Sequence, residues 1–152
     1  MTSVVPPRPI GYLVADIARL MRRRFVRALA AADTGVTAAE ARVLAYVEHY
    51  PGQRQAALAE RLGVEPMTLS ALLDRLEAAG LLRRLPDPQD RRAKLIEIDP
   101  NATPVLERIH DVAIRLRMEA VEGFAPADVD AVYDLLERMH ENLADCGPPE
   151  TS

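Results

Sequence analysis

The chain has 152 residues with a formal net charge of −4, and 49 % of them are hydrophobic. That length suits a single domain with a core, and with four Tyr, two Phe and no Trp the core must be largely aliphatic. The acidic balance argues against a uniformly basic surface for nucleic acid. The charge is uneven, however: residues 75–94 carry six basic and three acidic side chains, whereas residues 99–152 carry four and twelve. A local basic footprint on an acidic body therefore remains open.

Cysteine usage and the apolar runs bear on the compartment. The single cysteine, Cys146, excludes an intrachain disulfide and favours a reducing environment. No run approaches the roughly 18 apolar residues of a membrane span. Pro6, Pro7 and Pro9 precede an arginine-rich amphipathic segment, which is not the order of a signal peptide. We therefore expect a cytoplasmic protein with no membrane partner.

The N-terminal third is predicted to hold an arm and two helices. Residues 1–9 have three prolines and no periodicity, which indicates a flexible arm. Apolar residues then recur every three or four positions, predicting an amphipathic helix over residues 10–32. Thr37 and Glu40 have the spacing of a capping box, in which each satisfies a backbone N–H at a helix start. The helix that they begin is expected to stop before Pro51.

The middle of the chain has the pattern of a helix-turn-helix. A short helix is predicted over residues 54–62, broken by Gly63, and a longer one over residues 66–79. Pro66 is favoured as the first residue of a helix. The buried stripe of the longer helix is expected to be Leu69, Leu72, Leu73 and Leu76.

A hairpin and two helices are predicted to follow. Residues 81–85 and 94–98 have strand character and flank a polar, proline-containing loop, which indicates a basic two-stranded wing over residues 81–98. Further helices are predicted from residue 100 and from residue 126. The first of them carries a stripe at heptad-like spacing, formed by Val105, Ile109, Val112 and Leu116. The fold class is therefore mainly α, a winged helix-turn-helix flanked by terminal helices.

The exposed face of the longer helix could enter a DNA major groove. Thr68 and Ser70 offer hydroxyls to base edges or phosphates, Met67 offers an apolar contact, and Arg75 is placed to reach a phosphate. At the hairpin tip, Arg91 and Arg92 have little structural purpose, but arginine suits a narrow minor groove. Asp90 is expected to pair with Arg92 and hold it extended. The candidate DNA-binding residues are Arg54, Pro66, Met67, Thr68, Ser70, Arg75, Asp90, Arg91, Arg92 and Lys94.

These motifs resemble the MarR family. Gly63–Leu82 is similar to its recognition helix and exit, and Asp87–Lys94 to its wing signature, while Gly11–Val14 and Thr103–Glu107 resemble the SlyA branch. The resemblance implies recognition-helix contacts from Pro66, Thr68 and Ser70, and a minor-groove Arg92 supported by Asp90. It also implies a homodimer that binds a pseudo-palindromic operator as a transcriptional regulator, expected to be a repressor. Where many relatives have Arg on the recognition helix, this chain has Ala71, so one contact is missing.

Dimerisation and effector binding are the further expectations. Residues 10–35 and 100–146 are assigned to dimerisation and residues 36–99 to DNA binding, because amphipathic stripes at both ends need a partner. Relatives often sense small aromatic carboxylates or phenols. The candidate residues for such an effector here are Tyr12, Arg19, Tyr46, His49 and Tyr50, with Arg19 facing the carboxylate.

Other functions are less favoured by the sequence. The chain has no phosphate-binding glycine loop, nucleophile elbow or Cys–His pairing, so no enzyme or cofactor is expected. The three histidines have no metal-ligand spacing, and Cys146 lies far from the first helix, where some relatives sense oxidants. The alternatives that stay open are a redox- or metal-responsive regulator and a winged helix used only for protein–protein interaction.

Overall fold

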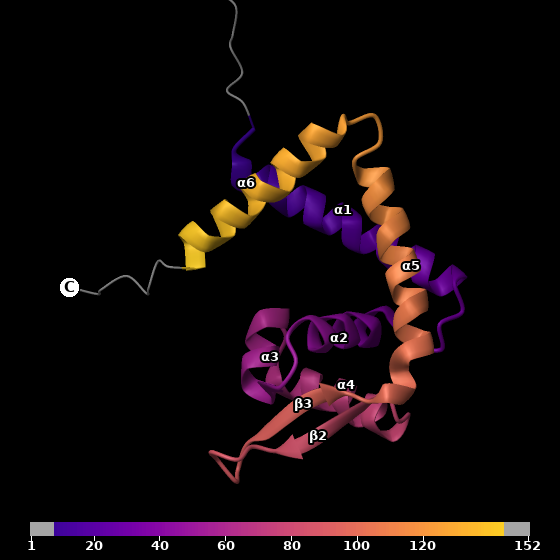
Figure 1. The fold of residues 1–152 in the computed structure, drawn as a ribbon, viewed down its shortest axis with the longest axis vertical. Coiled ribbons are helices and arrows are strands. Elements are labelled where there is room, and N and C mark those ends of the chain that lie inside the picture. Colours follow the sequence, from indigo (N-terminus) through magenta and orange to yellow (C-terminus); the bar gives the residue numbers. More distant parts are fainter. Residues whose placement is uncertain (1–7, 145–152) are drawn as a thin grey trace, which may run out of the picture. The chain divides into compact units, whose positions relative to one another are not determined.

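The computed structural model describes residues 8–144 and is mainly helical, as predicted (Figure 1). The chain divides into two compact units, Met1–Leu116 and Arg117–Ser152. Within residues 8–144, none of the helices has the length and apolar character that a membrane span requires. The elements are α1 (Ile10–Ala31), α2 (Ala38–His49), β1 (Gln53–Arg54), α3 (Gln55–Leu62), α4 (Pro66–Ala78), β2 (Leu82–Pro86), β3 (Lys94–Ile98), a 3-10 helix η1 (Pro100–Ala102), α5 (Thr103–Ala120) and α6 (Pro126–Ala144).

The capping box at the start of α2 is confirmed. The Glu40 backbone N–H donates to Thr37 Oγ1 at 3.2 Å, and the Thr37 N–H donates to Glu40 Oε2 at 2.9 Å. Two N–H groups at the helix start are thus satisfied by side chains. This fixes where α2 begins and leads its buried residues Ala41, Leu44 and Val47 into the core.

The helix-turn-helix is also confirmed. Gly63 ends α3 in the left-handed conformation with φ of 62°, which a glycine adopts without a Cβ clash. Pro66 then starts α4 at a position where a backbone N–H would have no helical acceptor. The predicted stripe is buried, as all four of its leucines are less than 10 % exposed: Leu69, Leu72, Leu73 and Leu76.

The sheet differs from the prediction, because it has three strands rather than two. β2 and β3 form the expected antiparallel hairpin, with Leu82 opposite Ile98 and Pro86 opposite Lys94. The two-residue strand β1 pairs with the other edge of β3, with Arg54 opposite Leu95. Arg54 is therefore a strand residue, and the predicted helix over 54–62 begins one residue later. Figure 1 shows the loop between β2 and β3 projecting away from the helices.

The core changes the argument for α5 as a dimerisation helix, although that assignment itself stays a prediction. Its stripe was predicted to need a second chain, but Ile109 and Val112 are each 1 % exposed and belong to the same cluster as Leu44, Leu73 and Ile96. The chain thus covers most of this stripe itself. By contrast, α1 leaves a row of apolar side chains at least 41 % exposed: Ile10, Leu13, Val14, Ile17 and Leu20.

Helix α6, in the second unit, buries none of its residues. Its exposed apolar side chains include Tyr133, Leu135, Leu136 and Leu143. An amphipathic helix of this kind gains stability from packing rather than from intrinsic propensity. Its apolar side chains are thus available to pack against another surface.

Candidate nucleic-acid interface

The exposed face of α4 carries small and flexible side chains at its start. Met67 is 86 % exposed, and Thr68 and Ala71 are also exposed, whereas Ser70 is half-buried. The adjacent backbone N–H groups of a helix start favour negative charge such as phosphate. The face can therefore approach a nucleic-acid groove closely, although Ser70 is less accessible than predicted.

The base of the wing is fixed by a buried carboxylate. Asp87 is 6 % exposed and its Oδ1 accepts the Gln89 N–H at 2.8 Å, while its Oδ2 accepts Arg54 Nε at 2.7 Å. The backbone bond from Gln89, together with Arg54 and against the cost of desolvation, holds the pKa of Asp87 below its ordinary value. Arg54, predicted as a DNA contact, is thus tied to β1, the edge strand, and to the start of the loop.

The wing tip presents the two predicted arginines to solvent. Asp90 supports Arg92 differently from the prediction, since its Oδ1 accepts the Arg92 backbone N–H at 3.0 Å rather than the guanidinium. This bond shapes the turn and leaves the side chain available. Arg91 and Arg92 are exposed, and within residues 8–144 neither guanidinium has an acidic partner.

Four predicted DNA-binding residues line one cavity of about 760 Å³ beside α3 and the wing: Arg54, Pro66, Arg92 and Lys94. Glu60 and Glu65 also line it, so the cavity is not uniformly basic. The structure therefore brings Arg54, the start of α4 and the wing cations together, although they lie up to 40 residues apart in sequence.

Arg75 is held from within the chain. Its Nε donates to Glu40 Oε1 at 2.8 Å, while its side chain stays 58 % exposed. Burial alone would raise the pKa of Glu40, but the hydrogen bonds from Arg75 and Thr37 outweigh it and hold that pKa below its ordinary value. The predicted phosphate contact would have to compete with this ion pair.

Arg84 is a residue that positions the candidate interface, and sequence reasoning missed it. It lies on β2 and reaches α4, where Nη2 donates to Asp74 Oδ1 at 2.7 Å and Nη1 donates to Glu77 Oε2 at 2.6 Å. Burial alone would lower the pKa of Arg84, but these two carboxylates raise it. The side chain is 17 % exposed. Arg84 therefore links the hairpin to the recognition helix and sets their relative position.

The predicted effector residues lie in two places. Tyr46, His49 and Tyr50 line a cavity of about 510 Å³ that also includes His110. The rings of His49 and Tyr50 meet edge to face at 4.7 Å between centroids, and His110 Nε2 lies 2.6 Å from Glu48 Oε2. Tyr12 is 70 % exposed on α1, and Arg19 lines a separate cavity whose described lining residues include no aromatic side chain. The structure thus gathers Tyr46 and His49 of α2 with Tyr50, which follows that helix, but does not bring Arg19 to them.

Metal and redox sites were the remaining sequence alternatives. Among residues 8–144, no group of three or more His, Cys, Asp or Glu side chains is placed to hold a metal ion. Cys146 lies outside the described residues. Neither alternative gains support from the described geometry.

Comparisons with known proteins agree with this architecture. A MarR family model matches residues 34–93. The structure of apo wild-type MarR from E. coli is 26 % identical, with a TM-score of 0.73, and the match covers 87 % of this chain and 97 % of that one. The transcriptional regulator PA3341 is 31 % identical, also with a TM-score of 0.73, over 90 % of this chain and 99 % of that one.

A further solved structure, similar at 26 % identity and a TM-score of 0.67, is a mutant MarR from E. coli complexed with operator DNA. The match covers 86 % of this chain and 93 % of that one. The matched family model spans the helix-turn-helix and the wing loop, and the structural matches extend along both terminal regions. The chain belongs to the MarR family of winged helix transcriptional regulators.

Proposed function

We propose that this chain is a sequence-specific regulator that binds duplex DNA as a homodimer, with residues 66–79 in the major groove and the wing, residues 81–98, in the minor groove. The observation that carries the proposal is the wing tip. Two exposed arginines, with no acidic partner among residues 8–144, stand on a loop that Asp87 and Asp90 hold in shape. A fixed cationic projection beside a small-residue helix face matches adjacent minor and major grooves.

The homodimer is supported by the exposed row on α1. Several apolar side chains left in water are unfavourable, because burying each contributes about 1.5–3 kcal/mol. A two-fold dimer would cover them and set two recognition helices roughly 34–36 Å apart, one turn of DNA. Repression would follow where such a site overlaps a promoter. The motifs in Gly11–Val14 and Thr103–Glu107 favour the SlyA branch within the family.

The test is selection of bound fragments from random duplex DNA by the purified protein, followed by sequencing. We expect a palindromic motif with half-site centres about 10–10.5 base pairs apart. Thr68→Ala should relax preference at one position in each half-site, by about 1–3 kcal/mol of discrimination. Thr103→Ala, the same substitution on α5, serves as the control. If no motif is enriched, the protein-interaction alternative is favoured instead.

We propose that a small aromatic carboxylate or phenol modulates DNA binding from the cavity that Tyr46, His49, Tyr50 and His110 line, called the α2 cavity below. The observation that favours it is the grouping of Tyr46, His49 and Tyr50, with the Arg61 guanidinium 4.2 Å from the centre of the Tyr50 ring. Such a ligand releases DNA only if it binds the DNA-incompetent dimer more tightly. DNA titrations with and without salicylate should show weaker binding, and Tyr50→Ala should remove that response. An equal response in Tyr50→Ala would place the effector elsewhere.

A further inference from the structure

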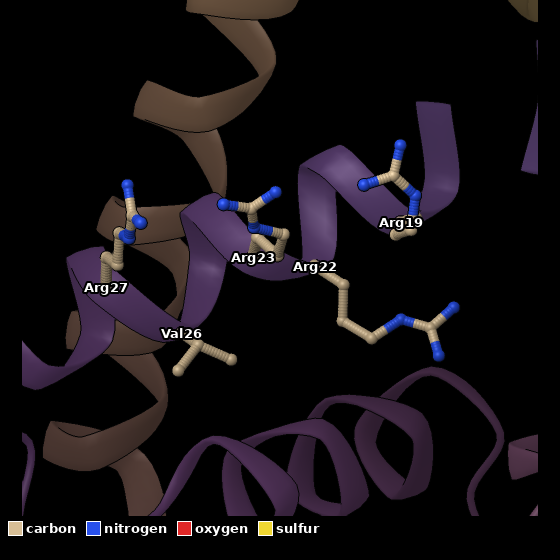
Figure 2. Close-up of a pocket in the computed structure, with 5 residues that line it drawn as sticks. All are labelled: Arg19, Arg22, Arg23, Val26 and Arg27. Atoms are coloured by element: carbon tan, nitrogen blue, oxygen red, sulfur yellow. The ribbon is translucent and has the colours of Figure 1, made fainter. Parts of the chain in front are cut away.

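The cavity that Arg19 lines lies on α1, and four of its five described lining residues are arginines. It has a volume of about 480 Å³, and its lining residues are Arg19, Arg22, Arg23, Val26 and Arg27. Figure 2 shows Arg19, Arg23 and Arg27 projecting from one side of α1, with Arg22 and Val26 leaving on another. Because residues four apart share a face of a helix, the first three form a row that spans about 12 Å at 1.5 Å of rise per residue.

The cations of this cavity are poorly neutralised by the chain. Arg19 Nη2 pairs with Asp16 Oδ1 at 3.2 Å, but Asp16 also pairs with Arg8 at 3.5 Å. The side chains of Arg22, Arg23 and Arg27 form no hydrogen bond or ion pair with any other residue in 8–144. Four guanidiniums thus share a fraction of one carboxylate.

Such a row is unfavourable without a counter-charge. Like charges at i and i+4 destabilise a helix by mutual repulsion, and here the repulsion occurs twice in succession along α1. An anion that bridges several guanidiniums would remove it. Guanidinium groups bind phosphate and carboxylate oxygens through paired, charge-assisted hydrogen bonds, and a cavity of this volume lies within the range that small ligands occupy.

We propose that this α1 cavity is a binding site for a small, multiply charged oxyanion, a molecule with two or more phosphate or carboxylate groups. Among the described residues that line it, Val26 is the one apolar side chain and none is aromatic, so they offer no ring for an aromatic monocarboxylate to stack on. The ligand class therefore differs from the one proposed for the α2 cavity. The site also stands independently of DNA binding.

A second copy of the chain is the competing occupant. Helix α6 carries acidic residues three and four apart, at Asp130, Asp134, Glu137 and Glu141, which could neutralise the same row. The oxyanion is favoured because four arginines of α1 line one open cavity, which a small anion can enter. A titration can distinguish binding of an oxyanion from contact with a second copy of the chain.

The experiment is calorimetric titration of the full-length protein in low salt with sodium tripolyphosphate, citrate and acetate, in the absence of DNA. We expect saturable binding of tripolyphosphate or citrate near one per chain and none of acetate, and the stronger of the two identifies the phosphate or carboxylate source. Arg23→Gln should weaken binding about ten-fold or more, since it removes a charge-assisted contact. Arg24→Gln removes the same charge from the same helix outside the cavity lining and should change affinity less than about two-fold.

Several outcomes would overturn the proposal. They are the absence of binding by either polyanion, an equal loss in Arg23→Gln and Arg24→Gln, or a shift of Arg23→Gln from dimer to monomer in sedimentation with ligand affinity unchanged. The last would assign the row to a second copy. Because no DNA is present, failure here leaves the proposed DNA binding intact, and failure to select a DNA motif leaves this site intact.

Discussion

Helices α1 and α5 carry apolar residues at the same three- and four-residue spacing, yet their environments differ. On α5, Ile109 is 1 % exposed and packs in the core, whereas on α1 Ile17 is 48 % exposed. The arginines divide in the same way, since Arg54 and Arg84 are paired with acids, whereas Arg91 and Arg92 have no acidic partner in the described part of the chain. Groups satisfied within the chain stabilise the fold, and groups left unsatisfied are those available for binding.

The largest expected effect is a loss of folding stability on substitution in the buried apolar stripe of α5. Ile109→Ala should lower the free energy of unfolding by about 2–5 kcal/mol, because a fully buried side chain leaves a cavity. The effect should not depend on protein concentration. Chemical denaturation at two concentrations measures it. A loss below about 1 kcal/mol would mean that α5 is not part of the core as described.

The matched change on α1 tests the unsatisfied stripe. Ile17→Ala removes apolar surface whose burial would contribute about 1 kcal/mol to the free energy of association per copy. A two-fold interface contains this residue twice. We therefore expect the dimer dissociation constant to rise about thirty-fold, as measured by sedimentation. If Ile17→Ala leaves association unchanged but lowers unfolding stability at every concentration, the row is covered within one chain instead.

A substitution at Arg84 tests whether an arginine paired within the chain supports DNA binding by positioning the hairpin against α4. Arg84→Gln removes both ion pairs with α4 and should cost about 1 kcal/mol of stability. It should also weaken DNA binding, because the hairpin and α4 are no longer fixed relative to each other. Arg83→Gln is the control, as its nearest acids, Glu97 and Asp99, are each 3.8 Å away. Equal effects of the two changes would remove the assigned role of Arg84.

Acidification should affect Asp87, a carboxylate whose hydrogen-bond partners lie within the chain. Asp87 has a lowered pKa in the folded state, so its contribution is present above the ordinary carboxyl pKa of about 4 and is lost as pH falls through the folded value. Melting temperatures from pH 6 to pH 2 should fall less steeply below pH about 4 in Asp87→Asn than in the wild type. Identical slopes would show that this carboxylate is not preferentially ionised in the fold.

Local signals in the sequence were sufficient for most of the elements. The Thr37–Glu40 capping box, the Gly63 turn and Pro66 act within a few residues of themselves, and all three lie where they were predicted. Strand β1 was missed because it has two residues and exists only by pairing with β3, more than 40 residues later. A strand that short has no periodicity to detect.

In the candidate site, too, local features could be predicted from the sequence and long-range contacts could not. The exposure of Met67, Thr68 and the wing arginines followed from helix and hairpin geometry. The partners of Arg54, Arg75 and Arg84 lie 7–35 residues away in sequence, and many acids were available to each. The choice among them depends on tertiary packing, which periodicity does not specify.

The most direct test of DNA binding through the wing compares Arg92→Ala with the wild type on duplex DNA across a range of salt concentrations. Arg92 is unpaired by acids of the described chain, so its removal should leave the unfolding free energy nearly unchanged. Affinity should fall, and the slope of log affinity against log salt should become shallower by about one unit per lost phosphate contact. Wild-type affinity and an unchanged salt slope in Arg92→Ala would contradict the account.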